Sequence, residues 1–356
     1  MKKRFLILSI ILSLSMIFSA CGTSTTADSQ TAEYSTSEAQ SQTSEKNETP
    51  LTVSSAEGLN KGARMNGNDS NGSISTIKQA DTELQEMINS VADKFQQGEY
   101  TDTASGLTIP YNIYLPENYD STRKYPMVVF IGDMTTVGTD MEYPLTQGWG
   151  GLIWASEEVQ SSTECIVLVP VYPETILDDH DGYTTTEYVD ITPNMIASVA
   201  GQYNVDTERI YGTGQSMGAM TTLILAARNP DLYASILIVD GQWNVSELEG
   251  LESQNMIYIA AGGDESAANG QNEVKDMLTQ DGIEYSEISE LDAQADRNEL
   301  NDSVQEMLDE GNNINFITWK AGTVMQGVSE GITMEHMASF DYGYKLSSVL
   351  KWILSK

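Results

Sequence analysis

Histidine, cysteine and basic residues are scarce in this 356-residue sequence, which has two histidines, two cysteines, and 18 Lys and Arg against 52 Asp and Glu. The formal net charge of −34 argues against nucleic acid or an anionic lipid surface as a ligand, because both repel an acidic protein. Cys21 and Cys165 are too few for a disulfide framework. Any histidine chemistry has to use His180 or His336.

The first 20 residues have the layout of a secretory signal peptide, with Lys2, Lys3 and Arg4 before a short, serine-containing apolar run. The run is too short and too polar for a typical transmembrane helix. The stretch Phe18–Cys21 resembles a bacterial lipobox, in which the cysteine is lipidated. We therefore expect cleavage after residue 20 and a lipid anchor at Cys21, which would hold the protein on the extracellular face of a bacterial cell membrane. Losing three basic residues and no acidic one changes the net charge from −34 to −37.

Residues 21–75 are rich in Ser, Thr, Gln and Glu and contain hardly any large apolar side chain. Such a segment buries too little surface to offset the entropy lost on ordering, so we expect a disordered tether. Residues 76–356 are long enough for one domain with a substantial core.

Short apolar runs alternate with helical patterns along this domain. The expected strands are "YNIYLP", "MVVFIG", "CIVLVP", "RIYGTG", "ASILIVD", "MIYIAA" and "INFITW". The expected helices are "TPNMIASVAGQY", with Thr192 as cap and Pro193 in the first turn, "SMGAMTTLILAARNP", "GQNEVKDMLTQDG", "RNELNDSVQEMLDEG" and "DYGYKLSSVLKWILSK". Apolar strands separated by helices predict an α/β fold with a mainly parallel sheet and helices on both faces. Cys165 lies in one of these strands and is expected to be a buried small hydrophobe.

Gly214, Ser216 and Gly218 form the pattern Gly-x-Ser-x-Gly at a predicted strand-to-helix junction. A nucleophile elbow needs small residues two positions before and after the serine, because a Cβ there would collide with the strand or the helix. The following helix directs its first N–H groups at the site, where they favour negative charge. This context predicts that Ser216 is a nucleophile and that the Met217 amide is an oxyanion-hole donor.

A serine hydroxyl needs a base, normally histidine. His336 follows Ser216 in the chain, as the order Ser, Asp or Glu, His of α/β-hydrolases requires, whereas His180 precedes it. His180 stands among aspartates and is expected in a solvent-exposed loop, with cation binding as a weaker alternative. Asp264, at the end of the strand "MIYIAA", is the favoured third member, and Asp240, one strand earlier, is the alternative.

Four blocks together carry a family resemblance: "GLTIPYNIYLPENYDSTRKYPMVVFIGD", "YNVDTERIYGTGQSMGAM", "IYIAAGGDE" and "MEHMASFDYGYKLSSVLKWILSK". They resemble secreted α/β-hydrolases of the predicted-peptidase, polyhydroxybutyrate-depolymerase-like, and feruloyl and acetyl xylan esterase group. The resemblance implies an α/β-hydrolase fold, a serine hydrolase mechanism without cofactor or metal, and the triad Ser216, Asp264 and His336.

One position departs from the family pattern, which has His-Gly where this chain has Gly132-Asp133. The second oxyanion donor is then expected to be Met134 or Asp133, and a carboxylate beside the oxyanion would be unfavourable unless it points away. The tract from residue 285 to 311 is longer than the usual link and predicts an extra strand and helix, as a candidate wall of the cleft.

The expected function is that of an extracellular, membrane-tethered serine hydrolase that cleaves a carboxylic ester of a small molecule or polymer. A secreted serine peptidase and a non-catalytic ligand-binding lipoprotein on the same fold are the alternatives, because a fold does not fix its function. Trp149 and Trp243 lie in predicted loops and are candidates for stacking against substrate, with a role as covers for the core as the alternative.

Overall fold

Nine strands form the central sheet of the computed structural model, which describes residues 77–180, 182–328 and 335–356, in the order β1-β2-β4-β3-β7-β8-β9-β11-β10. Strand β2 is antiparallel to β1 and β4, and every other neighbouring pair is parallel. The strands are β1 Gln96–Thr101, β2 Thr108–Tyr114, β3 Tyr125–Ile131, β4 Ile166–Pro170, β7 Val205–Gln215, β8 Ser235–Val239, β9 Met256–Ala261, β10 Ser286–Leu291 and β11 Ile314–Trp319. Two short strands, β5 Leu177–Asp178 and β6 Thr184–Thr185, form a separate hairpin.

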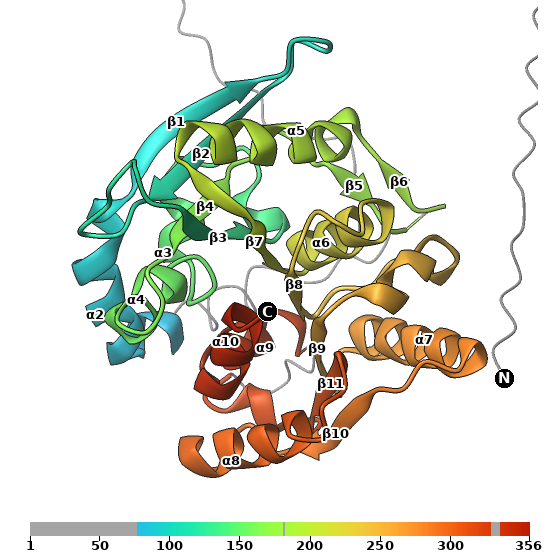
Figure 1. Cartoon of the computed structure of the whole chain (residues 1–356). Coiled ribbons are helices and arrows are strands. Elements are labelled where there is room, and N and C mark those ends of the chain that lie inside the picture. Colours follow the sequence, from blue (N-terminus) through green and yellow to red (C-terminus); the bar gives the residue numbers. More distant parts are fainter. Residues whose placement is uncertain (1–76, 181, 329–334) are drawn as a thin grey trace, which may run out of the picture. The chain divides into compact units, whose positions relative to one another are not determined.

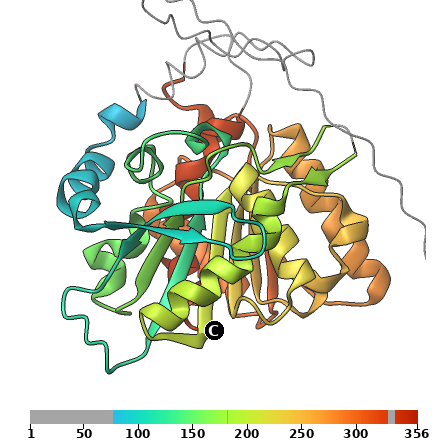
Figure 2. The same cartoon turned by 90° about the horizontal axis from the view of Figure 1, so that it is seen from above.

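Helices cover both faces of the sheet. They are α2 Thr82–Val91, α3 Tyr143–Thr146, α4 Glu157–Gln160, α5 Glu187–Gln202, α6 Met217–Arg228, α7 Glu265–Asp281, α8 Arg297–Leu308, α9 His336–Tyr344 and α10 Ser347–Leu354. Helices α5, α6 and α7 lie on one side of the sheet and α8, α9 and α10 on the other (Figure 1). The two views agree in placing α2 and α7 on opposite sides of the domain (Figure 2). The predicted α/β-hydrolase architecture is confirmed.

Strand β3 shows why these sequences become central strands. All seven of its residues are buried, and successive side chains enter two different cores. Met127 and Val129 belong to the core that also contains residues of α5, α6 and α7, whereas Val128 and Phe130 belong to the core that contains residues of α9 and α10. A strand covered on both faces needs apolar side chains at every position, which explains the unbroken Val- and Ile-rich runs.

Three helix predictions were wrong in their bounds. The helix predicted from Gly270 begins five residues earlier, at Glu265 in α7. Helix α5 begins at Glu187, so that Thr192 is not its cap and Pro193 lies inside it. The first turns of α5 bury Tyr188, Val189 and Ile191, and this packing outweighs the proline. The last predicted helix is two helices, because the chain is extended at Leu346 between α9 and α10.

The tract from residue 285 to 311 contains the predicted extra strand and helix. Strand β10 lies parallel to β11 at the edge of the sheet, and α8 packs beside α10. The predicted signal peptide, Cys21 and the tether lie outside the described residues. Within the described part of the chain, no helix has both the length and the apolarity needed to cross a bilayer.

Candidate active site

Ser216 lies in a sharp turn between β7 and α6, with φ 52° and ψ −120°. A non-glycine residue in this region costs about 1–3 kcal/mol, which the surrounding packing has to hold in place. The turn is tight on both sides of Ser216. A Cβ on Gly214 would lie 2.4 Å from the carbonyl carbon of Gly218, and a Cβ on Gly218 would lie 1.9 Å from the Ile131 carbonyl oxygen. Both glycines are therefore required by backbone contacts.

The three residues predicted to act together are joined by two hydrogen bonds. Ser216 Oγ lies 2.7 Å from His336 Nε2, and Asp264 Oδ2 lies 2.5 Å from His336 Nδ1. Each residue occupies an element end. Ser216 follows β7 and precedes α6, Asp264 follows β9 and caps α7, where it accepts the Ala267 amide at 3.3 Å, and His336 begins α9.

Burial opposes protonation of His336, but its hydrogen bond to Asp264 and the charges of Asp264, Asp240 and Asp133 outweigh burial and raise the pKa of His336 above its usual value. The ring packs edge-on against Phe340, with centroids 5.0 Å apart. An imidazole with this environment can accept a proton from Ser216 and keep the resulting charge stabilised.

Asp240, the alternative acid, has other partners. Its Oδ1 accepts the Ala261 amide at 2.7 Å and its Oδ2 accepts the Ser339 hydroxyl, so that Asp264 rather than Asp240 occupies His336 Nδ1. Burial raises the pKa of Asp240 to about 7, and the charge of Asp264 adds to this effect. Asp240 therefore anchors the first turns of α9 through its hydrogen bond with Ser339.

The two predicted oxyanion donors lie in segments that pack together. A Cβ added to Gly218 would lie only 1.9 Å from the Ile131 carbonyl oxygen, so the first turn of α6 packs closely against the end of β3, where the loop to Met134 begins. Within the described part of the chain, neither the Met217 nor the Met134 amide has a hydrogen-bond acceptor. Backbone N–H groups in this condition are available to an oxyanion.

The carboxylate of Asp133 is held by the protein itself. Oδ1 accepts the amide and the hydroxyl of Thr135 at 2.8 and 2.5 Å, and Oδ2 accepts Gln215 Nε2 at 2.7 Å. Both oxygens are thus bonded to donors. Because Gln215 directly precedes Ser216, this contact ties the loop after β3 to the elbow, a role that the sequence did not reveal.

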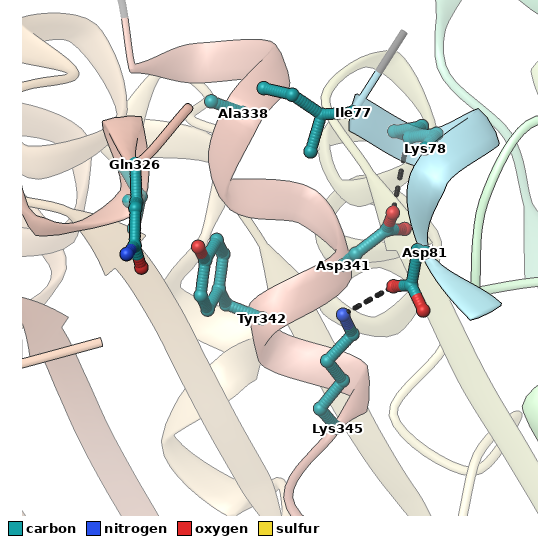
Figure 3. Close-up of a pocket in the computed structure, with 9 residues that line it drawn as sticks. Ile77, Lys78, Asp81, Gln326, Ala338, Asp341, Tyr342 and Lys345 are labelled. Atoms are coloured by element: carbon teal, nitrogen blue, oxygen red, sulfur yellow. Dashed lines mark hydrogen bonds and ion pairs between the residues drawn. The ribbon is translucent and has the colours of Figure 1, made fainter. Parts of the chain in front are cut away.

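Trp149 does not offer a free stacking face, contrary to the prediction. Its side chain is buried, its backbone amide donates to Asp341 at 2.9 Å and its indole N–H donates to Asp81 at 3.1 Å. The Lys345 ammonium lies 4.8 Å from the ring centroid. Figure 3 shows the ion pairs Lys78–Asp341 and Lys345–Asp81, which join the segment before α2 to α9 and the residue that follows it. Asp81 and Asp341 are the same residues that bind Trp149. Trp149 thus belongs to a structural junction.

Trp243 likewise fits the alternative of a core cover rather than a stacking platform. It is 2% exposed and packs edge-on against Tyr183, with ring centroids 5.1 Å apart. It belongs to the core formed with α5, α6 and α7. Both tryptophans therefore cover core residues, and neither is exposed as a substrate platform.

His180 lies in an exposed loop as expected, with Nδ1 at 3.2 Å from Asp178 and 3.1 Å from Asp179. Candidate ligand atoms of these three residues lie within 4.8 Å of one another. Cys165 is fully buried, and burial raises the pKa of its thiol to about 12, as expected of a small core residue.

Sequence reasoning missed Glu335, which directly precedes His336 and is only 3% exposed. The donors to its carboxylate lie more than ten positions away in the chain, so no local pattern points to it.

Comparison with known proteins yields a family and a fold. Residues 103–305, more than half of the chain, match the model of the Esterase family ("Putative esterase"). Acetylxylan esterase A of Emericella nidulans is 28% identical over 179 residues, which cover 44% of this chain and 54% of that protein. Acetylxylan esterase A of Talaromyces purpureogenus is 40% identical over 48 residues, 14% of this chain and 13% of that protein. The chain thus matches about half, or less, of the length of these relatives.

Two solved structures share the fold. A thermostable esterase has a TM-score of 0.58 at 21% identity, covering 74% of this chain and 64% of its own. The feruloyl esterase module from Clostridium thermocellum, as an S954A mutant complexed with sinapinate, has a TM-score of 0.51 at 15% identity, covering 75% and 91%.

Proposed function

Because the chain belongs to the Esterase family, we propose that it hydrolyses carboxylic esters through an acyl-enzyme formed on Ser216. The observation that carries this proposal is the hydrogen-bonded chain from Ser216 Oγ through the His336 ring to Asp264, at 2.7 and 2.5 Å. Nucleophile, base and orienting carboxylate stand in the relation that serine hydrolysis requires.

In the first half of the proposed reaction, Ser216 Oγ attacks the ester carbonyl carbon while His336 Nε2 takes the hydroxyl proton. The carbonyl oxygen becomes an oxyanion that accepts hydrogen bonds from the Met217 and Met134 amides. The bond from carbon to the alcohol oxygen then breaks, and His336 gives its proton to the departing alcohol. Asp264 holds the imidazole in the required tautomer and stabilises its positive charge.

In the second half, water attacks the acyl carbon and gives a proton to His336. The bond to Ser216 Oγ breaks, the proton returns to that oxygen, and a carboxylic acid leaves. The cycle consumes one ester and one water and releases one alcohol and one carboxylic acid, so it balances with the residues described and needs no cofactor.

A short acyl group is the proposed substrate preference, since the relatives at 28 and 40% identity are named acetylxylan esterases. The test compares p-nitrophenyl acetate, p-nitrophenyl octanoate and acetylated xylan as substrates of the full chain. Fastest cleavage of the acetyl esters is expected. Faster cleavage of the octanoate would contradict the preference but not the mechanism.

The proposed mechanism is tested with Ser216→Ala and His336→Gln, which should both abolish turnover of p-nitrophenyl acetate. Asp178→Asn, at the exposed end of β5 beside His180, is a matched surface control and should retain it. Unchanged turnover by Ser216→Ala would refute the assignment. The non-catalytic binding protein is the alternative; a free Asp133 carboxylate beside the oxyanion would favour it, and the hydrogen bonds that Asp133 accepts from Thr135 and Gln215 count against it.

We also propose that the protein is lipid-anchored at Cys21, outside a bacterial cell membrane, on the sequence of residues 1–21. Cells fed an alkyne-bearing fatty acid should label the full chain, and Cys21→Ala should abolish the label. Equal labelling of both would contradict the anchor.

A further inference from the structure

Glu335 is a buried carboxylate that joins the histidine segment to the aspartate segment. Its Oε2 accepts the Gly263 amide at 2.8 Å, and its Oε1 accepts the Gly322 amide. Gly263 directly precedes Asp264, and Gly322 lies in the turn after β11. Within the described part of the chain, no lysine or arginine lies within ion-pair distance of Glu335. We propose that Glu335 is a positioning residue that fixes His336 relative to Asp264, an inference that rests on the proposed function.

Two hydrogen bonds connect the dipeptide Gly263–Asp264 to the dipeptide Glu335–His336. One is the bond between the side chains of His336 and Asp264, and the other is the bond from the Gly263 amide to Glu335. With the two peptide bonds, these hydrogen bonds form a closed cycle. A closed cycle restricts both the distance and the orientation of the imidazole, whereas a single hydrogen bond would leave the imidazole free to pivot.

The Glu335 carboxylate occupies the space that a side chain at position 263 would need. A Cβ at this position would lie 2.4 Å from Glu335 Cδ and 2.5 Å from its Oε1, so only glycine admits the side chain in its present place. Burying a charge without a cation is costly, and backbone donors have to compensate. Since both donors come from loops at the carboxyl ends of β9 and β11, the burial serves to connect these loops to the start of α9.

The backbone of Glu335 also begins helix α9. Its carbonyl oxygen accepts the amides of Ala338 and Ser339 at 2.9 and 3.0 Å. A displacement of Glu335 would therefore move the first turn of the helix and the His336 ring with it. A misplacement of about 1 Å in a catalytic constellation costs roughly 10²-fold in rate.

Two substitutions separate position from charge. Glu335→Gln keeps the length but removes the charge and leaves one of the two backbone amides facing an NH2 group. Glu335→Asp keeps the charge but withdraws the carboxylate by one methylene. If Glu335 acts by position, both variants lose rate. If it acts only through its charge, Glu335→Asp behaves like the parent.

The experiment measures kcat, KM and the pH profile of kcat/KM for the full chain with p-nitrophenyl acetate. Both variants are expected to lose roughly 10²-fold in kcat with little change in KM, and the acidic limb should move to lower pH because the contact of His336 with Asp264 loosens. Asp102→Asn is the matched control, because Asp102 is also a buried carboxylate that accepts two backbone amides, at 2.9 and 3.0 Å from Ser105 and Ala104, far along the sheet. It should leave the profile unchanged.

A second readout does not depend on turnover. The chain has only two histidines, so 15N NMR of the full chain can follow His336 alone, with His180→Gln for assignment. A lower pKa of His336 in both Glu335 variants supports the inference, even if the parent cleaves no ester and the proposed function fails. A parental pKa in Glu335→Asp overturns it.

Gly263→Ala approaches the same contact from the other side and leaves Glu335 intact. The added Cβ should displace the carboxylate and reproduce the loss of kcat and the shift of the acidic limb. Parental kcat and pH profile in well-folded Gly263→Ala would overturn the inference. This variant keeps the inference testable if both Glu335 variants fail to fold.

Discussion

Replacing Gly218 with alanine should separate the elbow from strand β3. The new Cβ would lie 1.9 Å from the Ile131 carbonyl oxygen, 2.5 Å from its carbon and 2.8 Å from the Gly132 carbonyl oxygen. All three are backbone atoms of the strand end and of the loop that carries Met134, so no side chain can rotate away. To reach even a 3.0 Å contact, the first turn of α6 has to move by about 1 Å.

That movement displaces the Met217 amide and Ser216 together. We expect kcat/KM to fall by roughly 10²-fold, as for a 1 Å misplacement in a catalytic site, and the free energy of unfolding to fall by about 1–3 kcal/mol, as for overpacking. The assays are hydrolysis of p-nitrophenyl acetate and urea unfolding of the same protein.

Gly201→Ala is the matched control, because Gly201 lies in helix α5 and nothing stands within 4 Å of its would-be Cβ. This variant should keep full activity and gain about 0.4–1 kcal/mol in stability. If Gly218→Ala kept parental kcat/KM, the close approach of the elbow to β3 could not be what positions the oxyanion donors.

Three further predictions concern the carboxylates and the histidine. Asp264→Asn should lower kcat by about 10⁴-fold, because the imidazole would take the wrong tautomer, whereas Asp240→Asn should cost far less; equal losses measured by steady-state kinetics would contradict the assignment of the acid. The pKa of His336 is raised by Asp264, so kcat/KM measured from about pH 5 to 9 should decline on acidification with a midpoint above 6.5, and a midpoint below that value would contradict the contact. Asp240 has a pKa of about 7 when folded and an ordinary value of 3.8, so the folded state holds its proton more tightly, and this stability is lost as the pH rises from about 4 to 7 and changes little above that; urea midpoints of Asp240→Asn should lack this decline, and parental pH dependence would contradict it.

The central strands of the sheet and the elbow at Ser216 could be predicted from sequence because their signals are local, whereas Asp264 and His336 were proposed from their order along the chain. Central parallel strands are apolar at every position, and the elbow needs Gly214 and Gly218 beside its serine. Strand β1, with the sequence QQGEYT, escaped prediction because an exposed edge strand needs no apolar face. The start of α5 was misplaced because packing of its first turns outweighs the signal of Pro193.

Other contacts between distant segments left no signal in the sequence. The burial of Trp149 depends on Asp81 and Asp341, which are 68 and 192 positions away. Glu335 is held by amides 72 and 13 positions away, and nothing in its neighbourhood sets it apart from other glutamates. The environment of Asp133 was likewise invisible, because Gln215 is 82 positions distant.

The most direct test of the central claim is to find the acyl group on the protein. The full chain is mixed with p-nitrophenyl acetate, quenched in acid during turnover and digested, and the acetylated peptide is sequenced by mass spectrometry. The account predicts one acetyl group on Ser216, absent from Ser216→Ala. Turnover without acylation of Ser216, or acylation that persists in Ser216→Ala, would contradict it.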